Sequence, residues 1–185
     1  MSLATNEHSV VRCPWGDDPA MIEYHDTEWG KELRGDRELF ERMSLEAFQS
    51  GLSWLIILRK REGFREAFAN FDPEVVATFG DADVDRLLQD AGIVRNRMKI
   101  EATISNARTL LELDESFSDL LWSFAPPPSP APKAYADVTA TTPESIAMAK
   151  ALKKKGLRFF GPTTAYALMQ ATGMVNDHLE DCIAR

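Results

Sequence analysis

The sequence predicts an all-α fold for a chain of 185 residues. Apolar residues recur at helical spacing, and proline and glycine occur where helices usually start and stop. No segment shows the sustained alternation of polar and apolar residues that is typical of strands. The chain is 44% hydrophobic and contains four Trp and ten Phe, which is ample material for a buried core. We therefore expect about eight to ten short helices.

Apolar stripes place the main helices. The first long helix is predicted over residues 36–54, and two further helices are predicted around residues 84–88 and 100–111. The stripes consist of Leu39, Phe40, Met43 and Ala47; of Val84, Leu87 and Leu88; and of Ile100, Ile104, Ala107 and Leu111.

Proline and glycine mark the helix ends. Asp72-Pro73 and Thr142-Pro143 each have the pattern of an N-cap residue followed by the first helical residue. Three glycines stand where C-terminal glycines are expected, namely Gly92, Gly156 and Gly173.

Two segments lie outside the predicted helices. Residues 1–11 have no helical or strand period, so we expect a disordered tail or a cloning remnant that includes His8. The segment APPPSPAPKAY, residues 125–135, is rich in proline and is predicted to be an extended surface loop. The 50 residues after it are too few for a comfortable independent domain, so residues 12–185 are predicted to form one helical domain.

The charge balance argues against a protein that coats nucleic acid. There are 21 basic and 29 acidic residues, which gives a net charge of −8. Basic residues nevertheless cluster in LRKR (58–61), VRNRMK (94–99) and KKKGLR (153–158), each of which can meet a phosphate. Each also fits a solvated helix end, so only their convergence in space would indicate a DNA-binding surface.

The stretch LLQDAGIVRNRMKI, residues 87–100, has a helix-hairpin-helix pattern. An apolar helix is predicted to end at Gly92, and a basic helix to start near Asn96. Such a hairpin can present backbone N–H groups and a helix N-terminus to a phosphate. Many ordinary helix pairs are also joined through glycine, and Val94 stands where a second small residue is common, so both interpretations remain open.

The sequence predicts a cytoplasmic protein. No apolar run approaches the roughly 20 residues that span a bilayer, and the N-terminus lacks a signal pattern. We expect no membrane partner and a monomeric state. Cys13 and Cys182 lie far apart in a chain without secretion signals, which argues against a disulfide framework and leaves metal binding or burial.

Two cysteines and two histidines form a candidate metal site. His178 and Cys182 are four residues apart in VNDHLEDC, so a closing helix would place them on one face, and Cys13 and His25 can complete a Cys2His2 set. The alternative is that they are simply buried residues. If all four bind one zinc ion, its tetrahedral shell is full and its role is structural.

Glu46 is the candidate functional carboxylate. It lies in the stripe of positions 39, 43, 46 and 50 of the first long helix, where a carboxylate must be paired, protonated or available to a ligand. Tyr24, Trp29 and Trp54 lie near it in sequence, and Trp15 lies close to Cys13. These aromatic residues can belong to the core. A carboxylate among aromatic faces also fits a site for a flat, electron-poor ring such as a methylated nucleobase.

Several motifs, in order and spacing, resemble bacterial 3-methyladenine DNA glycosylase I of the helix-hairpin-helix glycosylase superfamily. The motifs are RCPWGDDPAMIEYHDTEWG (12–30), LEAFQSGLSW (45–54), LLQDAGIVRNRMKI (87–100), LLWSF (120–124) and ALKKKGLRFFGPTTAYALMQATGMVNDH (151–178). The resemblance runs from Arg12 to Cys182. It implies excision of 3-methyladenine from alkylated double-stranded DNA, leaving an abasic site without strand cleavage.

The resemblance also implies roles for individual residues. Cys13, His25, His178 and Cys182 match ligands of one structural zinc ion that joins the N-terminal segment to the C-terminal helix. Glu46 matches the carboxylate that recognises the base and is our candidate catalytic residue. Tyr24 and Trp54 match stacking aromatics, and Trp15 is a further candidate for the pocket. Leu52 matches the residue that wedges into the duplex. Met21 departs from relatives that have a tyrosine there, although methionine can still contact a ring edge.

Two other functions compete with this interpretation. One is a zinc-stabilised helical module that binds DNA without catalysis, which release of the free base would exclude. The other is a hydrolytic zinc enzyme, which needs an open coordination position that four protein ligands would deny. The resemblance does not imply the aspartate that stabilises the sugar cation elsewhere in the superfamily, and no general base is assigned.

Overall fold

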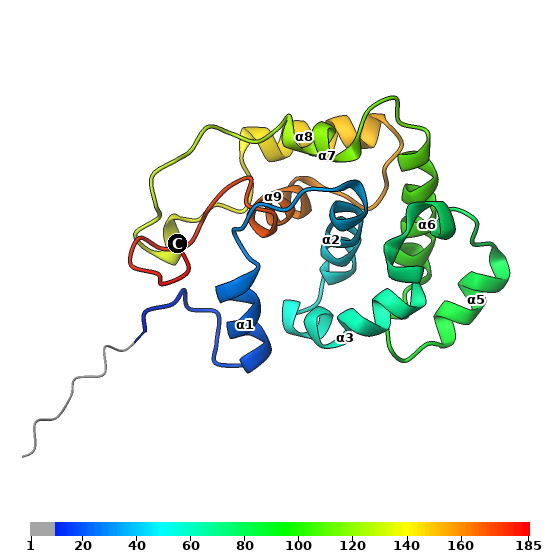
Figure 1. The fold of residues 1–185 in the computed structure, drawn as a ribbon, viewed down its shortest axis with the longest axis horizontal. Coiled ribbons are helices and arrows are strands. Elements are labelled where there is room, and N and C mark those ends of the chain that lie inside the picture. Colours follow the sequence, from blue (N-terminus) through cyan, green and yellow to red (C-terminus); the bar gives the residue numbers. More distant parts are fainter. Residues whose placement is uncertain (1–9) are drawn as a thin grey trace, which may run out of the picture.

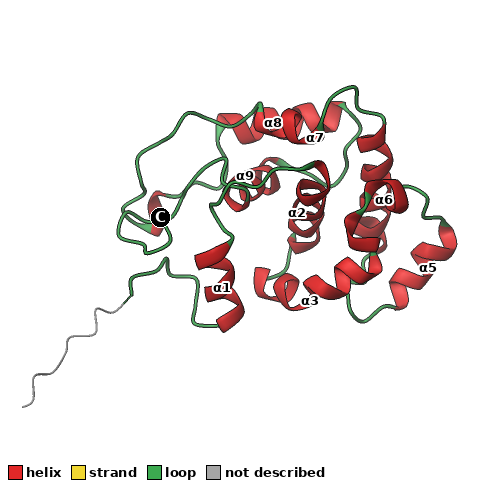
Figure 2. Cartoon of the chain, in the orientation of Figure 1, coloured by secondary structure: helices red, strands yellow, loops and turns green. Residues whose placement is uncertain are grey.

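The computed structural model describes residues 10–185, which form nine α-helices and two short 3₁₀ turns and contain no β-strand (Figure 2). The predicted all-α fold is confirmed for these residues. Most of the tail predicted over residues 1–11, including His8, lies outside the described residues. Val10 and Val11, the two tail residues that are described, are exposed and have no regular secondary structure.

The elements follow one another along the chain without long interruptions except at the Pro-rich loop. They are α1 (Pro19–Thr27), α2 (Asp36–Gln49), α3 (Trp54–Ala67), η1 (Ala69–Phe71), α4 (Pro73–Val76), α5 (Asp81–Gln89), α6 (Arg97–Leu111), α7 (Phe117–Trp122), η2 (Tyr135–Asp137), α8 (Pro143–Lys154) and α9 (Pro162–Ala171).

Helix α2 is central to the fold (Figure 1). It contacts α3, α6, α7 and α9, and its Leu39, Phe40 and Met43 are fully buried in the main hydrophobic core. This burial of the predicted apolar stripe removes a large nonpolar area from water and fixes the helix between its neighbours. Glu46 lies in the same stripe, one turn beyond Met43, and lines the site described below.

The predicted helix over residues 36–54 is two helices. Helix α2 ends at Gln49, Gly51 adopts a positive φ of 82°, and α3 begins at Trp54. The Gln49 side chain donates a hydrogen bond to the Leu52 carbonyl at 2.7 Å, which stabilises the turn. Ser50 therefore lies in an exposed turn and does not continue the stripe that contains Glu46.

Most predicted caps are confirmed. Asp72 and Thr142 accept hydrogen bonds from first-turn amides of α4 and α8 at 3.0 and 3.2 Å. Gly156 and Gly173 follow helix ends with φ of 99° and 73°, as C-terminal glycines do. Gly92 is different, because α5 already ends at Gln89 and the φ of Gly92 is not positive. Its backbone packs against Gly63 of α3, where a Cβ added to Gly63 would lie 2.5 Å from the Gly92 oxygen.

The two ends of the described chain lie side by side (Figure 1), and Ile183 donates a backbone hydrogen bond to Val11.

The predicted C-terminal helix is wrong. Helix α9 ends at Ala171, and the rest of the chain is a series of turns. Gly173 ends the helix, and the Asn176 side chain then accepts a hydrogen bond from the His178 amide, which favours a local turn over a helix.

In the Pro-rich stretch, residues 125–134 are irregular and lie between α7 and α8, and Tyr135 begins the turn η2. The loop is fixed to the C-terminal segment by a hydrogen bond from the Glu180 amide to the Pro132 carbonyl at 3.0 Å. At its end, Asp137 accepts hydrogen bonds from the Lys133 and Ala134 amides and so holds the turn η2. Within the described residues, no helix is both long and apolar enough to cross a membrane.

Candidate active site and metal centre

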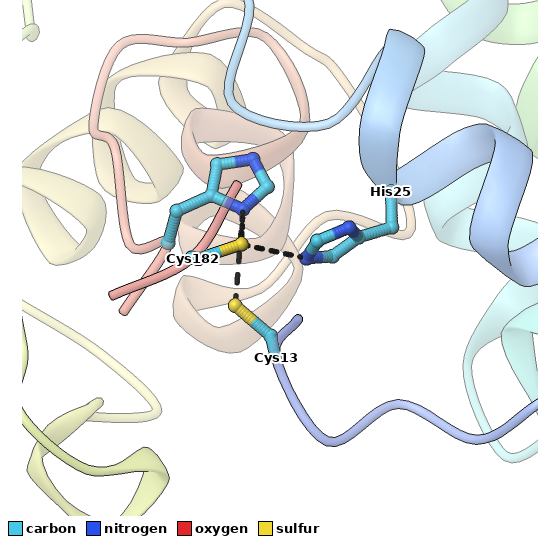
Figure 3. Close-up of side chains that lie close together, drawn as sticks. Cys13, His25 and Cys182 are labelled. Atoms are coloured by element: carbon cyan, nitrogen blue, oxygen red, sulfur yellow. Dashed lines mark hydrogen bonds between the residues drawn. The ribbon is translucent and has the colours of Figure 1, made fainter. Parts of the chain in front are cut away.

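Cys13, His25, His178 and Cys182 form one buried cluster. One potential ligand atom from each residue lies within 4.8 Å of all the others. Figure 3 shows Cys13, His25 and Cys182 pointing toward one another from separate segments of the chain. The predicted set of four therefore comes together, although His178 and Cys182 are brought together by a turn. The cluster can hold a metal ion.

The spacing of the cluster suits a tetrahedral ion. A metal ion with bonds of about 2.0 Å to nitrogen and about 2.3 Å to sulfur would hold neighbouring sulfur and nitrogen ligands about 3.5 Å apart. The Cys182 sulfur lies 3.4 Å from His178 Nδ1 and 3.5 Å from His25 Nε2, and the Cys13 sulfur lies 3.8 Å from His178 Nδ1. The residues present thus fit a four-coordinate metal site.

Neighbouring groups orient both imidazole rings toward the cluster. His178 Nε2 lies 2.9 Å from the Trp29 carbonyl, so it carries the proton and leaves Nδ1 free for a metal ion. His25 Nδ1 lies 2.7 Å from an oxygen of Asp26, which leaves Nε2 free in the same way. Hydrogen bonds from Arg12 and then from His25 lower the pKa of Asp26 to about 2, so this carboxylate is an anionic acceptor. Such outer partners are typical of histidine ligands.

Burial disfavours the ionised ligands when no cation is bound. It raises the pKa of the Cys13 thiol to about 11 and lowers the pKa of His178. A metal ion would therefore have to displace the thiol protons as it binds. The buried charge of two thiolates needs such a cation nearby.

A pocket of about 480 Å³ lies next to this cluster. It is lined by six of the predicted site residues, Cys13, Trp15, Met21, Tyr24, Glu46 and Trp54. The other three predicted metal ligands, His25, His178 and Cys182, do not line it, and neither does Leu52. Leu52 lies in the exposed turn between α2 and α3.

Glu46 is a nearly isolated carboxylate in this pocket. Its side chain is 6% exposed, and no residue among 10–185 donates a hydrogen bond to it. Burial raises the pKa of Glu46 to about 7, and the charge of Arg42 acts in the opposite direction. The alternative of a glutamate paired directly with arginine is not found, because Arg42 donates to Tyr24 and Glu28. The carboxylate is thus available to a ligand.

The aromatic residues surround this carboxylate with ring faces. The ring centroids of Tyr24 and Trp54 are 5.3 Å apart, and those of Trp15 and Tyr24 are 6.2 Å apart. Trp29 packs edge-on against Trp15 at 4.4 Å and against His178 at 4.7 Å, so one tryptophan contacts both the pocket and the metal cluster. The arrangement suits a planar ligand that carries positive charge.

Sequence reasoning missed part of the pocket. The additional lining residues include Gln49, Tyr135, Val138, Gln170 and Asp177. Tyr135 is the last residue of the Pro-rich stretch, and its aromatic side chain was the one available signal. Asp177 is held by Tyr166 and Gln170, which donate to the same carboxylate oxygen at 2.6 and 2.9 Å. In the sequence, Asp177 precedes the candidate metal ligand His178 in the VNDH motif, and no pattern marks the aspartate as a pocket residue.

Two of the three basic patches are occupied by protein contacts. In the first, Arg61 pairs with Glu28. In the second, Arg97 pairs with Asp85 and Glu101, while the buried Lys99 donates to the carbonyls of Phe48 and Ser50. Lys99 therefore caps the C-terminus of α2 and does not face a phosphate.

The third patch lines a groove of about 890 Å³ beside the α8–α9 hairpin. Lys150, Lys153 and Arg158 line this groove and form no ion pair with any residue that the structure describes. Asn106 of α6 holds the hairpin through two hydrogen bonds to the Arg158 backbone, at 3.0 and 2.8 Å. Ser50 lines the groove too, so the groove reaches the turn that carries Leu52.

Comparisons with known proteins agree with this site. The family model described as methyladenine glycosylase matches residues 15–185. DNA-3-methyladenine glycosylase of Haemophilus influenzae is 46% identical over 180 residues, covering 94% of this chain and 97% of the relative. DNA-3-methyladenine glycosylase 1 of Escherichia coli is also 46% identical, covering 94% and 96%.

Solved structures give the same result. A crystal structure of 3-methyladenine DNA glycosylase I matches with a TM-score of 0.92 at 46% identity, covering 95% of this chain and all of the other. The Staphylococcus aureus enzyme, whose structure concerns the recognition of 3-methyladenine, matches with a TM-score of 0.88 at 36% identity, covering 91% and 93%. The chain therefore belongs to the methyladenine glycosylase family.

Proposed function

We propose that this protein is a DNA repair glycosylase that flips 3-methyladenine out of alkylated double-stranded DNA and hydrolyses its glycosidic bond. One observation carries the proposal: Glu46 is a buried carboxylate without a hydrogen-bond partner among the described residues, in a pocket walled by aromatic rings. The relatives named as DNA-3-methyladenine glycosylases support it. The product is an abasic site.

The charge of the lesion explains the pocket. Methylation at N3 gives the adenine a positive charge, which the Glu46 carboxylate and the ring faces of Tyr24 and Trp54 attract. Neutral adenine gains less from the same groups. Trp15 and Met21 complete this wall of the pocket, with the methionine contacting a ring edge.

The positive charge of the methylated base also favours cleavage of the glycosidic bond. The departing base leaves as a neutral molecule, so little acid catalysis is needed, and water attacks a sugar with oxocarbenium character. Glu46 acts by stabilising the positive charge of the reacting nucleotide. No lysine is among the residues that line the pocket, so a Schiff base and strand cleavage are not expected.

DNA binding is proposed for the surface that joins the α8–α9 groove to the α2–α3 turn. Lys150, Lys153 and Arg158 offer cations that no described residue neutralises, and the N-cap residue of α9 is Gly161, which provides no side-chain cap. The first-turn amides of α9 can therefore bind a phosphate, as in a helix-hairpin-helix. Leu52, exposed at the neighbouring turn, is the proposed wedge into the duplex.

The cluster of Cys13, His25, His178 and Cys182 is proposed to bind one structural zinc ion. Two sulfur and two nitrogen donors at tetrahedral spacing are the ligand set that zinc prefers. All four positions come from protein, which leaves none for an activating water. The ion would hold residues 12–30 against the C-terminal segment and so fix one wall of the pocket. Residues 12–185 would then act as a single, monomeric domain, and we propose that it is cytoplasmic.

Release of free base from methylated duplex DNA tests the proposed activity. We expect the wild-type protein to release 3-methyladenine in single-turnover chromatographic assays without cutting the strand. Glu46→Gln should keep its fold and lower the rate by about 100-fold. Glu41→Gln is the matched control, because Glu41 lies on the same helix but pairs with Arg65 outside the pocket. Tight DNA binding without base release would instead support a non-catalytic DNA-binding module.

A further inference from the structure

A buried arginine adjoins the pocket and was not singled out by its sequence. Arg42 lies one helical turn before Glu46 on α2, and its side chain is 11% exposed. It donates a hydrogen bond to the Tyr24 hydroxyl at 2.8 Å and another to Glu28 at 2.9 Å. Its guanidinium carbon lies 5.2 Å from the centroid of the Tyr24 ring. Arg42 thus contacts one proposed base-stacking residue and neighbours the proposed base-recognising carboxylate.

The charged side chains beside Glu46 carry a net positive charge if the Glu46 carboxylate is left out. Arg61 of α3 donates to both oxygens of Glu28, at 2.9 and 2.8 Å, so Glu28 serves two guanidinium groups. Two positive charges therefore share one negative charge. The surplus positive charge lies beside the Glu46 carboxylate, which has no other partner among the described residues.

The other titratable groups at the pocket do not supply this charge. Cys13 comes from the N-terminal segment, Tyr24 from α1, Tyr135 from η2, and Asp177 from the segment after α9. None of these side chains carries a positive charge. The charge that favours the ionised form of Glu46 comes from Arg42, on the same helix.

We propose that Arg42 is a positioning residue of the base pocket, which fixes the Tyr24 ring and keeps Glu46 ionised for a cationic base. This inference rests on the proposed glycosylase function. Tyr24 accepts a hydrogen bond from Arg42, which restrains the rotation of its side chain. Held between Tyr24 and Glu28, the guanidinium stays close to Glu46.

The protonation states agree with this geometry. Burial alone would lower the pKa of Arg42, but Tyr24, Glu28 and Glu46 raise it, so the guanidinium remains charged. Burial raises the pKa of Glu46 to about 7, while Arg42 lowers it. Removing Arg42 should therefore raise the pKa of Glu46 further and protonate it at neutral pH. Because the ionised form is the active one, the acidic limb of the pH–rate profile should move to higher pH.

The test compares Arg42→Met, Arg42→Lys and the wild type in single-turnover release of 3-methyladenine between pH 5 and pH 9. We expect Arg42→Met to move the acidic limb upward by about one to three pH units, as expected for loss of an opposite charge at this range. Arg42→Lys keeps the charge and should restore the position of the limb, although the rate falls because the two hydrogen bonds are less well matched.

Arg65→Met is the matched control. Arg65 joins α3 to α2 through Glu41, and its hydrogen bonds go to Glu41 and Glu62, neither of which lines the pocket. Its variant should leave the acidic limb in place. Equal losses of rate in Arg42→Met and Arg42→Lys without any shift of the limb would show that Arg42 is only structural and would overturn the proposal.

A second measurement is independent of activity. The Glu46 carboxyl carbon, labelled with ¹³C and assigned with Glu46→Gln, can be titrated by NMR in the wild type and in Arg42→Met. A higher pKa of Glu46 in the variant supports the inference even if no base is released. An unchanged pKa overturns it even if the enzyme is active. Failure of the proposed function and failure of this inference are thus distinguishable.

Discussion

The Cys13 sulfur lies 3.8 Å from His178 Nδ1, although 165 residues separate them. This pair joins the N-terminal segment to the C-terminal segment at a point where neither is helical. Few backbone hydrogen bonds hold these two segments together, one being that from Ile183 to Val11. A metal ion bound by the cluster would therefore contribute much of the stability of this region.

We predict that the purified protein contains one zinc ion per chain and that Cys182→Ser unfolds at a lower temperature. Loss of one thiolate ligand should cost about 3 kcal/mol, or about 6–12 °C in unfolding temperature for a chain of this size. Metal analysis and calorimetry measure the two quantities. A chelator should destabilise the wild type much more than the variant. A wild-type protein that is metal-free and as stable as the variant would refute the assignment.

Glu46 should make the protein less stable at alkaline pH. Its pKa in the folded state, about 7, lies above the ordinary value of 4.5. The folded state therefore binds the proton more tightly than the unfolded state, so stability falls as the pH rises from about 4.5 to about 7 and stays lower above that. Glu46→Gln lacks this titration. The variant should gain on the order of 2 kcal/mol relative to the wild type between pH 5 and pH 8.

Denaturant unfolding of both proteins at the two pH values measures this gain. All other titrating groups are shared, so their contributions largely cancel in the difference. If the difference in unfolding free energy between variant and wild type is the same at both pH values, the raised pKa of Glu46 is wrong. If Glu46→Gln is more stable than the wild type at high pH and no longer releases base, the ionised carboxylate destabilises the fold but is required for activity.

The sequence allowed the helices and the metal ligands to be predicted for different reasons. The α2 stripe of Leu39, Phe40 and Met43 follows from local periodicity, which packing against the core then satisfies. The C-terminal helix was wrongly predicted because the spacing of His178 and Cys182 fits a helical turn. The glycine at 173 and the side chain of Asn176 instead favour a turn that brings the same two atoms together.

Other features depend on contacts between distant segments. Nothing local predicts that Lys99 points inward to cap α2, or that Tyr135 of the Pro-rich loop reaches the pocket of Glu46. Gly92 was assigned to a helix end because glycine commonly occurs there, whereas its backbone packs against Gly63, which has no room for a Cβ. Such positions are determined by packing, which a single sequence does not display.

Leu52→Ala should reduce base release from duplex DNA by about tenfold and leave release from methylated single strands unchanged. The side chain is 36% exposed and outside the pocket, so its removal should not disturb the fold. The Leu52 side chain is proposed to fill the space that the flipped nucleotide leaves in the duplex, and a single strand has no such space to fill. Single-turnover assays on both substrates measure the ratio. Ile56→Ala, which removes a similarly exposed side chain from α3, should affect neither. Equal losses on both substrates would contradict a wedge.

The groove beside the α8–α9 hairpin should account for a measurable part of the salt dependence of DNA binding. Each cation that meets a phosphate releases about 0.9 counterion equivalents, so Lys153→Ala and Arg158→Ala should each reduce the slope of log K against log salt by about one. Lys155→Ala provides the comparison, because Lys155 pairs with Glu115 at 2.8 Å and does not line the groove. Fluorescence anisotropy with undamaged duplex DNA at several salt concentrations gives the slopes. Because the chain carries a net charge of −8, DNA must be bound by a local surface, and unchanged slopes in both groove variants would place that surface elsewhere.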